Sequence, residues 1–135
     1  RWTWNLYRPV SERRPTWKDN QTRRQSVCRE CHNKVFVDDF YTNADAATET
    51  DTKLIRESNS IMAPAKAAGM LTDKPFDEPI DFTYFEAWHH WGRTAKFGTW
   101  MQGPDYTQWH GVYELLGDLA ELREWAESKL ASGTE

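Results

Sequence analysis

Cysteine is scarce in this chain: two cysteines occur among 135 residues, and no second pair accompanies them. A structural zinc site normally takes four protein ligands, so a single pair of cysteines supplies only half of one. Long hydrophobic runs are also missing, because no apolar stretch approaches the roughly 20 residues needed to cross a bilayer. The sequence therefore argues against a closed zinc module and predicts no membrane span.

Strand patterns and internal repeats are lacking too. No segment alternates apolar and polar residues convincingly, whereas several segments carry apolar residues at helical spacing. We therefore predict a mainly α-helical fold. Aromatic residues, by contrast, are abundant, with 8 Trp, 5 Tyr and 6 Phe. Such large side chains bury much area and can line a planar ligand, although packing alone also accounts for them.

Both cysteines lie in one short motif, Cys28-Arg29-Glu30-Cys31-His32. Two cysteines three positions apart, followed at once by histidine, form the attachment signature of a c-type haem. Cys28 and Cys31 can each add across a vinyl group of one porphyrin, and His32 can supply the proximal nitrogen to the iron. The alternatives are a zinc half-site, which lacks further ligands, and a redox Cys-x-x-Cys pair, which leaves His32 unexplained. We predict a covalent haem c here.

The expected compartment follows from this cofactor. Covalent haem c is matured on the outer side of an energy-transducing membrane, so we expect the periplasm or an equivalent extracytoplasmic compartment. The chain begins at Arg1 with neither an initiating methionine nor a signal peptide, and we treat it as a mature or partial chain.

Charge is distributed unevenly along the chain. Residues 1–24 hold seven Lys or Arg against two acids, and the remaining residues hold ten against nineteen. No nucleic-acid-binding motif accompanies the basic start, so we expect no nucleic-acid partner. Its arginines either meet carboxylates, on haem propionates or on an acidic partner surface, or form a solvated charge run. The residues concerned are Arg13, Arg14, Arg23 and Arg24.

Loop signals divide the chain into three parts. Residues 1–71 form an arm and the haem-binding segment, residues 72–81 an acidic loop with two prolines, and residues 82–135 a helical segment. The first part is expected to hold an extended arm over residues 1–26, with room for one short helix. Helices are expected over residues 33–50 and 52–68. Pro64 should kink or divide the second helix, and Gly69 should end it.

Capping and stop signals place the helices of the last part. Thr83 and Glu86 fit a capping box, which predicts a helix from about Tyr84. Gly98 and the glycine-proline pair at 103–104 should interrupt that helix. The final helix carries an apolar stripe that predicts core or a subunit interface. Its members are Val112, Leu115, Leu116, Leu119, Leu122 and Trp125.

The remaining histidines are candidate cofactor-binding residues. His89 and His90 are adjacent on the predicted helix and point about 100° apart, so at most one faces a given haem as a distal ligand. Tyr106 and His110 lie four apart and would share one face of a helix. The sequence does not choose which of His89, His90 and His110 ligates a haem iron. A tyrosine near haem can ligate, donate a proton or be oxidised, although most simply bury a ring.

Several stretches of the sequence resemble the octahaem hydroxylamine oxidoreductases and their hydrazine-oxidising relatives. They are Arg1-Trp2-Thr3-Trp4, the motif that ends at His32, Phe85-Glu86-Ala87-Trp88-His89-His90-Trp91-Gly92-Arg93, and Gly103-Pro104-Asp105-Tyr106-Thr107-Gln108-Trp109. The resemblance covers most of the chain. It implies the C-terminal helical segment of a multihaem cytochrome c, with an extended N-terminal arm.

The resemblance also implies a role for a tyrosine. In that family a C-terminal tyrosine forms covalent bonds to the catalytic haem of a neighbouring subunit in a trimer, which distorts the porphyrin. Tyr106 matches this position, and Tyr113 is the weaker match. The implied reaction is oxidation of hydroxylamine or hydrazine, with a small soluble cytochrome as electron acceptor. The haem at the cysteine motif would carry electrons, with His90 or His89 as its distal ligand or that of a neighbouring haem.

The chain departs from the family pattern in what it does not contain. The family's acid-base residues and the cysteines of its catalytic haem lie upstream, and this chain contains neither. Some relatives have a histidine where this chain has Ile61-Met62-Ala63-Pro64. Some relatives also have a C-terminal membrane anchor, which is missing here. The chain would therefore be one piece or subunit of an enzyme, located in the periplasm or an anammoxosome. Two alternatives stay open: a monohaem electron carrier, and an octahaem relative that reduces nitrite.

Overall fold

The computed structural model describes residues 15–132, so Arg13, Arg14 and the rest of the predicted arm over residues 1–14 lie outside the described part. The helices in chain order are α2 (Trp17–Cys28), α3 (Lys34–Ala67), α4 (Pro79–Phe85), the π-helical η2 (Glu86–Trp91), α5 (Gly92–Trp100), α6 (Pro104–Thr107), the π-helical η3 (Gln108–Val112) and α7 (Tyr113–Ser132). Residues 15–132 contain no strand, so the predicted mainly α fold is confirmed. None of the helices in this range is long and apolar enough to cross a membrane.

Internal contacts divide the chain into two compact units, residues 1–43 and 44–135. In the first unit, α2 begins with a capping box formed by Thr16 and Asp19. The Thr16 hydroxyl accepts the Asp19 N–H at 3.2 Å, and the Asp19 carboxylate accepts the Thr16 N–H at 3.0 Å. Hydrogen bonds from the side chain and then the backbone of Thr16 lower the pKa of Asp19. The short helix expected before the motif is therefore present, and it extends to Cys28 itself.

A single helix, α3, replaces the two helices predicted over residues 33–50 and 52–68, so the predicted division is wrong. Pro64 lies within the last turn, where its missing N–H leaves only the carbonyl of the exposed Ser60 without a helical donor. Water can satisfy that carbonyl. Gly69, with φ of +71°, ends the helix as predicted, and the Met70 N–H donates to the Ala65 carbonyl at 3.0 Å.

The helix predicted to begin near Tyr84 begins five residues earlier, at Pro79. Proline at the first helical position has its φ already set and has no N–H to satisfy. Asp81 accepts the N–H of Glu78 at 3.4 Å, so the capping interaction lies here and not at Thr83 and Glu86. Gly98 does not interrupt the helix either, because it lies inside α5. The break at the 103–104 pair occurs as predicted.

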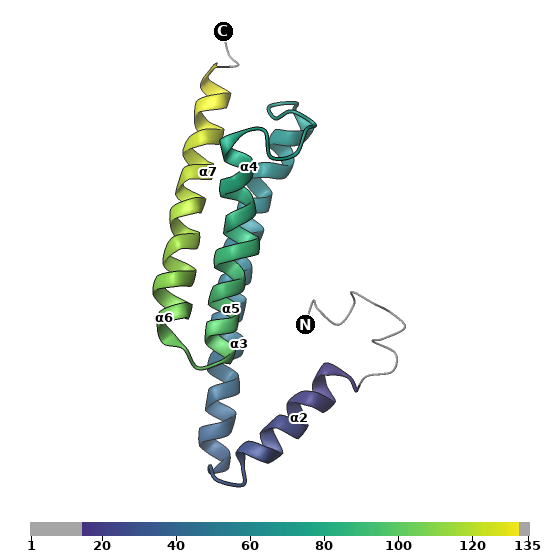
Figure 1. The fold of residues 1–135 in the computed structure, drawn as a ribbon, viewed down its shortest axis with the longest axis vertical. Helices are drawn as coiled ribbons and strands as arrows, with labels where there is room; N and C mark the ends of the chain where they lie inside the picture. Colours follow the sequence, from purple (N-terminus) through teal and green to yellow (C-terminus); the bar gives the residue numbers. More distant parts are fainter. Residues whose placement is uncertain (1–14, 133–135) are drawn as a thin grey trace. The chain divides into compact units, whose positions relative to one another are not determined.

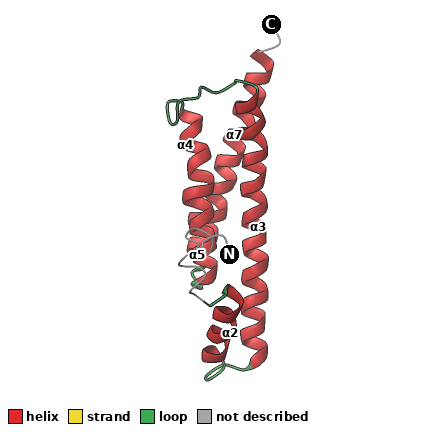
Figure 2. Ribbon diagram, turned by 90° about the vertical axis from the view of Figure 1, so that its right-hand side faces the viewer, coloured by secondary structure: helices red, strands yellow, loops and turns green. Residues whose placement is uncertain are grey.

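In the second unit, residues 44–67 of α3, the α4–η2–α5 segment and the α6–η3–α7 segment lie side by side (Figures 1 and 2). Leu115, Leu119 and Leu122 of the predicted stripe are fully buried, each stabilising the fold by about 1.5–3 kcal/mol. Met62 and Ile80 pack with Leu122 and so join three segments. Leu116, also assigned to the stripe, is instead about half exposed.

Hydrogen bonds between side chains join α3 to the other segments of this unit. The Trp100 indole N–H donates to the Thr48 hydroxyl at 3.0 Å, and the Tyr84 hydroxyl donates to the Asn59 side-chain oxygen at 3.0 Å. Together with the leucine core, these bonds set how α4 and α5 lie along α3. The two bonds lie on either side of the π-helical segment η2, which carries His89 and His90.

Candidate functional site

The cysteine motif lies at the turn between α2 and α3. Cys28 is the last residue of α2, and the N–H groups of Cys31 and His32 both donate to its carbonyl, at 3.3 and 3.0 Å. Both cysteines carry free thiols; Cys28 is half-buried, whereas Cys31 and His32 are exposed. The turn thus keeps two thiols and one imidazole close in the chain and accessible, and these are the groups that could hold a cofactor.

Apolar side chains around the motif are exposed. The His32 ring stacks on Phe36, with ring centroids 4.6 Å apart and planes 22° apart. Phe36, Val27 and Val35 are each more than half exposed. Asn33 orders this end of α3, because its side-chain oxygen accepts the Phe36 N–H at 2.9 Å. Large apolar groups beside accessible thiols are typical of a surface that another group covers.

The charged neighbours of the motif are paired with one another. Lys34 forms an ion pair with Asp38, and the Arg29 guanidinium lies 2.8 Å from the same carboxylate. Hydrogen bonds from Lys34 and then Arg29 hold the pKa of Asp38 below its usual value. Within residues 15–132, no three His, Cys, Asp or Glu side chains gather into a group that could hold a metal ion.

The adjacent histidines lie in the π-helical segment η2, and their surroundings differ. The His89 ring stacks on Phe85 at 4.4 Å, and the Arg93 Nη1 lies 3.3 Å from His89 Nε2. Because a guanidinium only donates, Nε2 must be the acceptor in this contact. His90 is exposed, its ring lies 4.3 Å from that of Trp91, and its ring nitrogens have no hydrogen-bond partner among the described residues. His90 is therefore the freer of the two.

Tyr106 and His110 lie on the second π-helical region, where α6 passes into η3. Their ring centroids are 5.8 Å apart, so the two side chains project together as their spacing predicts. His110 has non-helical backbone angles, φ −101° and ψ 18°, inside η3. Tyr106 is 61% exposed, and Trp109 and Tyr113 continue an exposed aromatic row with ring centroids 5.6 Å apart. Single π-helical turns of this kind occur frequently at functional sites.

The two π-helical segments contact each other, so η2 with His89 and His90 and η3 with His110 belong to one region of the second unit. The cysteine motif belongs to the first unit. Sequence reasoning predicted all the residues concerned but not the π-helical geometry, because apolar spacing does not distinguish a helix with an inserted residue from a regular one.

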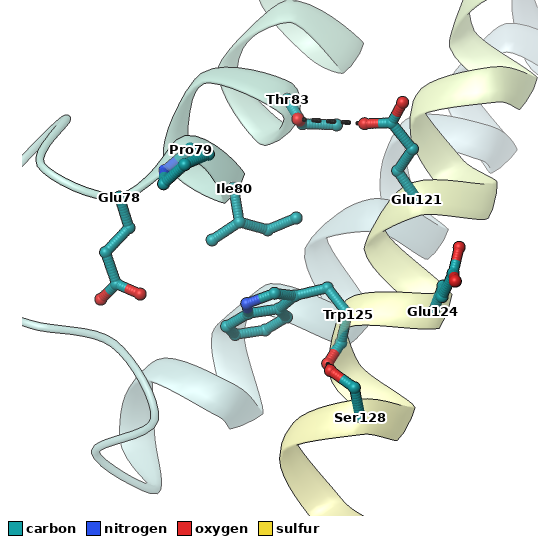
Figure 3. Close-up of a pocket in the computed structure, with 8 residues that line it drawn as sticks. All are labelled: Glu78, Pro79, Ile80, Thr83, Glu121, Glu124, Trp125 and Ser128. Atoms are coloured by element: carbon teal, nitrogen blue, oxygen red, sulfur yellow. Dashed lines mark hydrogen bonds between the residues drawn. The ribbon is translucent and has the colours of Figure 1, made fainter.

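A groove of about 400 Å³ lies between the start of α4 and the second half of α7 (Figure 3). The side chains of Glu78, Glu121 and Trp125 are among those that line it, and the Thr83 hydroxyl donates to Glu121 at 3.4 Å. It contains none of the predicted site residues. The carboxylates and the open shape do not match the predicted haem chemistry, so we do not assign the site to this groove.

Sequence reasoning missed a buried carboxylate in the middle of α3. Asp51 is only 3% exposed, and its Oδ1 has no hydrogen-bond partner. Burial raises the pKa of Asp51 to about 7, opposed in part by Lys96 on α5. A signal was present in the sequence, because the buried face of α3 repeats every seven residues. Ala44, Asp51, Ser58 and Ala65 are all buried.

Replacing Asp51 with asparagine should reduce a pH-dependent loss of stability. Below pH 3.8 the carboxyl is neutral in both the folded and unfolded states. Between pH 3.8 and about 7 it ionises only in the unfolded state, so the free energy of unfolding falls as pH rises, by up to about 4 kcal/mol. Urea unfolding of the purified protein across this range should show that fall. The Asp51→Asn variant should show a smaller one, because burial and then the nearby Glu86, Glu121 and Glu114 also raise the pKa of Asp118 to about 7.

Asp73→Asn, in an exposed loop, is the matched control and should leave the pH profile of the parent protein unchanged. Equal pH profiles for the parent and the Asp51→Asn variant would show that Asp51 ionises freely in the fold.

Comparison of the chain with protein-family models, with curated proteins and with solved structures gives no match.

Proposed function

We propose that this chain is part of a multihaem c-type oxidoreductase of the hydroxylamine- or hydrazine-oxidising kind. It would hold one electron-transfer haem at Cys28, Cys31 and His32, and place Tyr106 against the catalytic haem of a neighbouring subunit in a homotrimer. Such an enzyme acts in the periplasm or an equivalent compartment and passes electrons to a small soluble cytochrome.

The cysteine motif carries this proposal. Two free thiols and an accessible imidazole occur at the spacing that one porphyrin requires, and they use every cysteine in the chain. Each S–H adds across a vinyl group, so attachment forms a thioether without net oxidation. The exposed apolar side chains of Val27, Val35 and Phe36 would contact a haem held there, which accounts for large apolar groups that are otherwise left in water. These residues therefore fit a covalent haem.

His90 is the better candidate for a distal ligand. An axial imidazole must offer a nitrogen lone pair to iron. The Nε2 lone pair of His89 is directed to Arg93, whereas the nitrogens of His90 are free among the described residues. We therefore assign haem ligation to His90 and an orienting role to His89.

Tyr106 supports the oxidative direction of the chemistry. Its ring is exposed beside His110, on a segment whose backbone is held against α5. An exposed tyrosine on a well-ordered backbone can reach a group on another subunit without loss of position. The substrate, a small nitrogen compound, would bind at that neighbouring haem. The haem at Cys28 and Cys31 supplies an iron that accepts and releases electrons.

Haem counting and peptide mass spectrometry test the proposal in the native protein. We expect a pyridine haemochrome assay to give several haems per native complex. The tryptic peptide with Cys28 and Cys31 should carry one haem, and the peptide with Tyr106 should carry an additional haem-derived mass. A single haem per complex would instead identify a monohaem electron carrier. Several haems with an unmodified Tyr106 peptide would favour the nitrite-reducing alternative.

A further inference from the structure

The backbone of Tyr106 is enclosed by two glycines that come from different elements. Gly98 lies in α5 and Gly111 in η3, and both are buried. A Cβ atom at position 98 would lie 2.7 Å from the Thr107 nitrogen and 2.8 Å from the Tyr106 carbonyl carbon. A Cβ atom at position 111 would lie 2.6 Å from the Tyr106 carbonyl oxygen and 2.7 Å from the Ala95 Cα. Only glycine permits this close approach at either position.

Hydrogen bonds hold the same segment against the end of α5. The Gly103 N–H donates to the Gly98 carbonyl at 2.8 Å, and the Thr107 N–H donates to the Gly103 carbonyl at 3.1 Å. The Thr107 hydroxyl donates to that carbonyl at 3.1 Å and lies 3.3 Å from the Thr99 hydroxyl. The backbone on both sides of Tyr106 is therefore fixed, although the Tyr106 ring is exposed.

Another buried glycine of α5 makes a different kind of contact. A Cβ atom at Gly92 would approach the Cδ1 atom of Ile55 at 2.5 Å, which is the flexible end of a side chain and can move, and its nearest backbone atom, the Ala87 carbonyl oxygen, is 3.1 Å away. A Cβ atom at Gly98 would meet Tyr106 and Thr107, and one at Gly111 would meet the Tyr106 carbonyl oxygen as well as Ala95. The contacts with Tyr106 and Thr107 are mostly with backbone atoms, which cannot move without displacing Tyr106. Helix packing in general therefore does not account for the convergence of both glycines on one residue.

We propose that Gly98 and Gly111 are positioning residues for Tyr106, and that their close contact with its backbone sets where the phenol ring projects toward the neighbouring haem. This inference rests on the proposed function. A bond between two groups requires their atoms to be placed within about 0.5 Å of the productive geometry. A Cβ at either glycine would displace the Tyr106 backbone and move the ring away from that geometry.

Gly98→Ala and Gly111→Ala, each in the intact haem-loaded protein, test this role. The readout is the fraction of Tyr106 peptide that carries haem-derived mass, together with the oxidation rate. Circular dichroism and haem content report the fold. We expect both variants to fold and bind the electron-transfer haem, but to lose most of the Tyr106 modification and roughly a hundred-fold in oxidation rate. Gly92→Ala and Gly117→Ala, whose contacts do not include Tyr106, should retain both.

Each outcome decides a different point. Full modification in folded Gly98→Ala and Gly111→Ala proteins would overturn the positioning role and leave the proposed function intact. An unmodified Tyr106 peptide in the parent protein would overturn the cross-linking role first, and the positioning role with it. Thr107→Val decides the matter if neither glycine variant folds, because it removes the hydroxyl contacts without adding bulk. A reduced modified fraction in Thr107→Val would support the role, and an unchanged fraction would overturn it.

Discussion

Replacing Tyr106 with phenylalanine should abolish the proposed covalent link and lower the proposed hydroxylamine or hydrazine oxidation by roughly a hundred-fold or more. Phenylalanine keeps the ring and its exposed position but lacks the hydroxyl group through which a phenol is activated. Without the bonds, the neighbouring porphyrin would no longer be distorted or held in register. Activity should shift away from oxidation, and steady-state oxidation assays alongside nitrite-reduction assays on the purified variant would measure this shift.

Tyr113→Phe is the matched control, because Tyr113 belongs to the same aromatic row and is 63% exposed. We expect it to keep the parent rate and the parent haem spectrum. Unchanged oxidation by the Tyr106→Phe variant would contradict the role of Tyr106. Loss of oxidation in Tyr113→Phe alone would transfer that role to Tyr113.

Replacing both Cys28 and Cys31 with serine should remove one covalent haem from each chain. Serine has nearly the size of cysteine, but its hydroxyl does not form the thioether bonds that hold the porphyrin. On a denaturing gel, the haem stain of the double variant should be weaker than that of the parent chain by the amount that one haem contributes. If the chain is a monohaem carrier, no covalent haem should remain. Electron delivery to the soluble acceptor should fall with the haem.

Single replacements provide graded comparisons for the same haem. Cys31→Ser alone should leave one thioether, and haem should still survive denaturation. His90→Ala should shift the reduction potential of a bis-histidine haem and alter its spectrum, whereas His89→Ala should change both less. A covalent haem retained in the Cys28→Ser, Cys31→Ser double variant would contradict attachment at this motif. A larger change for His89→Ala than for His90→Ala would reverse the assignment of the distal ligand.

The predictions about the fold that the structure confirms are those that depend on neighbouring residues in the chain. The helical class, the end of α3 at Gly69 and the break at 103–104 follow from backbone rules that act within a few residues, and the structure agrees with them. The predicted helix start near Tyr84 and the predicted division of α3 at Pro64 failed for two different local reasons. Pro79 with Asp81 is the stronger start signal than Thr83 with Glu86, and Pro64 lies too near the helix end to divide α3.

Some features of the candidate site could likewise be predicted from the sequence, and others could not. The spacing of Cys28, Cys31 and His32 is a chemical requirement that can be seen in the sequence, as is the four-residue separation of Tyr106 and His110. The difference between His89 and His90 was only partly visible in the sequence, because Arg93 stands four residues after His89, but the geometry of the contact depends on the π-helical turn. Asp51 was missed because its burial depends on the packing of α3 in the second unit.

The sequence by itself determined the helical class, the thiol and imidazole chemistry of the motif and the identity of the candidate tyrosine, because these depend on residue type and short spacing. The tertiary structure alone decided which histidine keeps its nitrogens free, which carboxylate is buried and how closely Gly98 and Gly111 hold Tyr106. The burial of Asp51 depends on packing between segments that are far apart in the chain, whereas the His89–Arg93 contact and the glycine contacts of Tyr106 depend on the backbone conformation of the π-helical segments and of the turn at 103–104. Helix packing and the backbone conformation of these segments set the distances, and neither follows from residue type and short spacing alone.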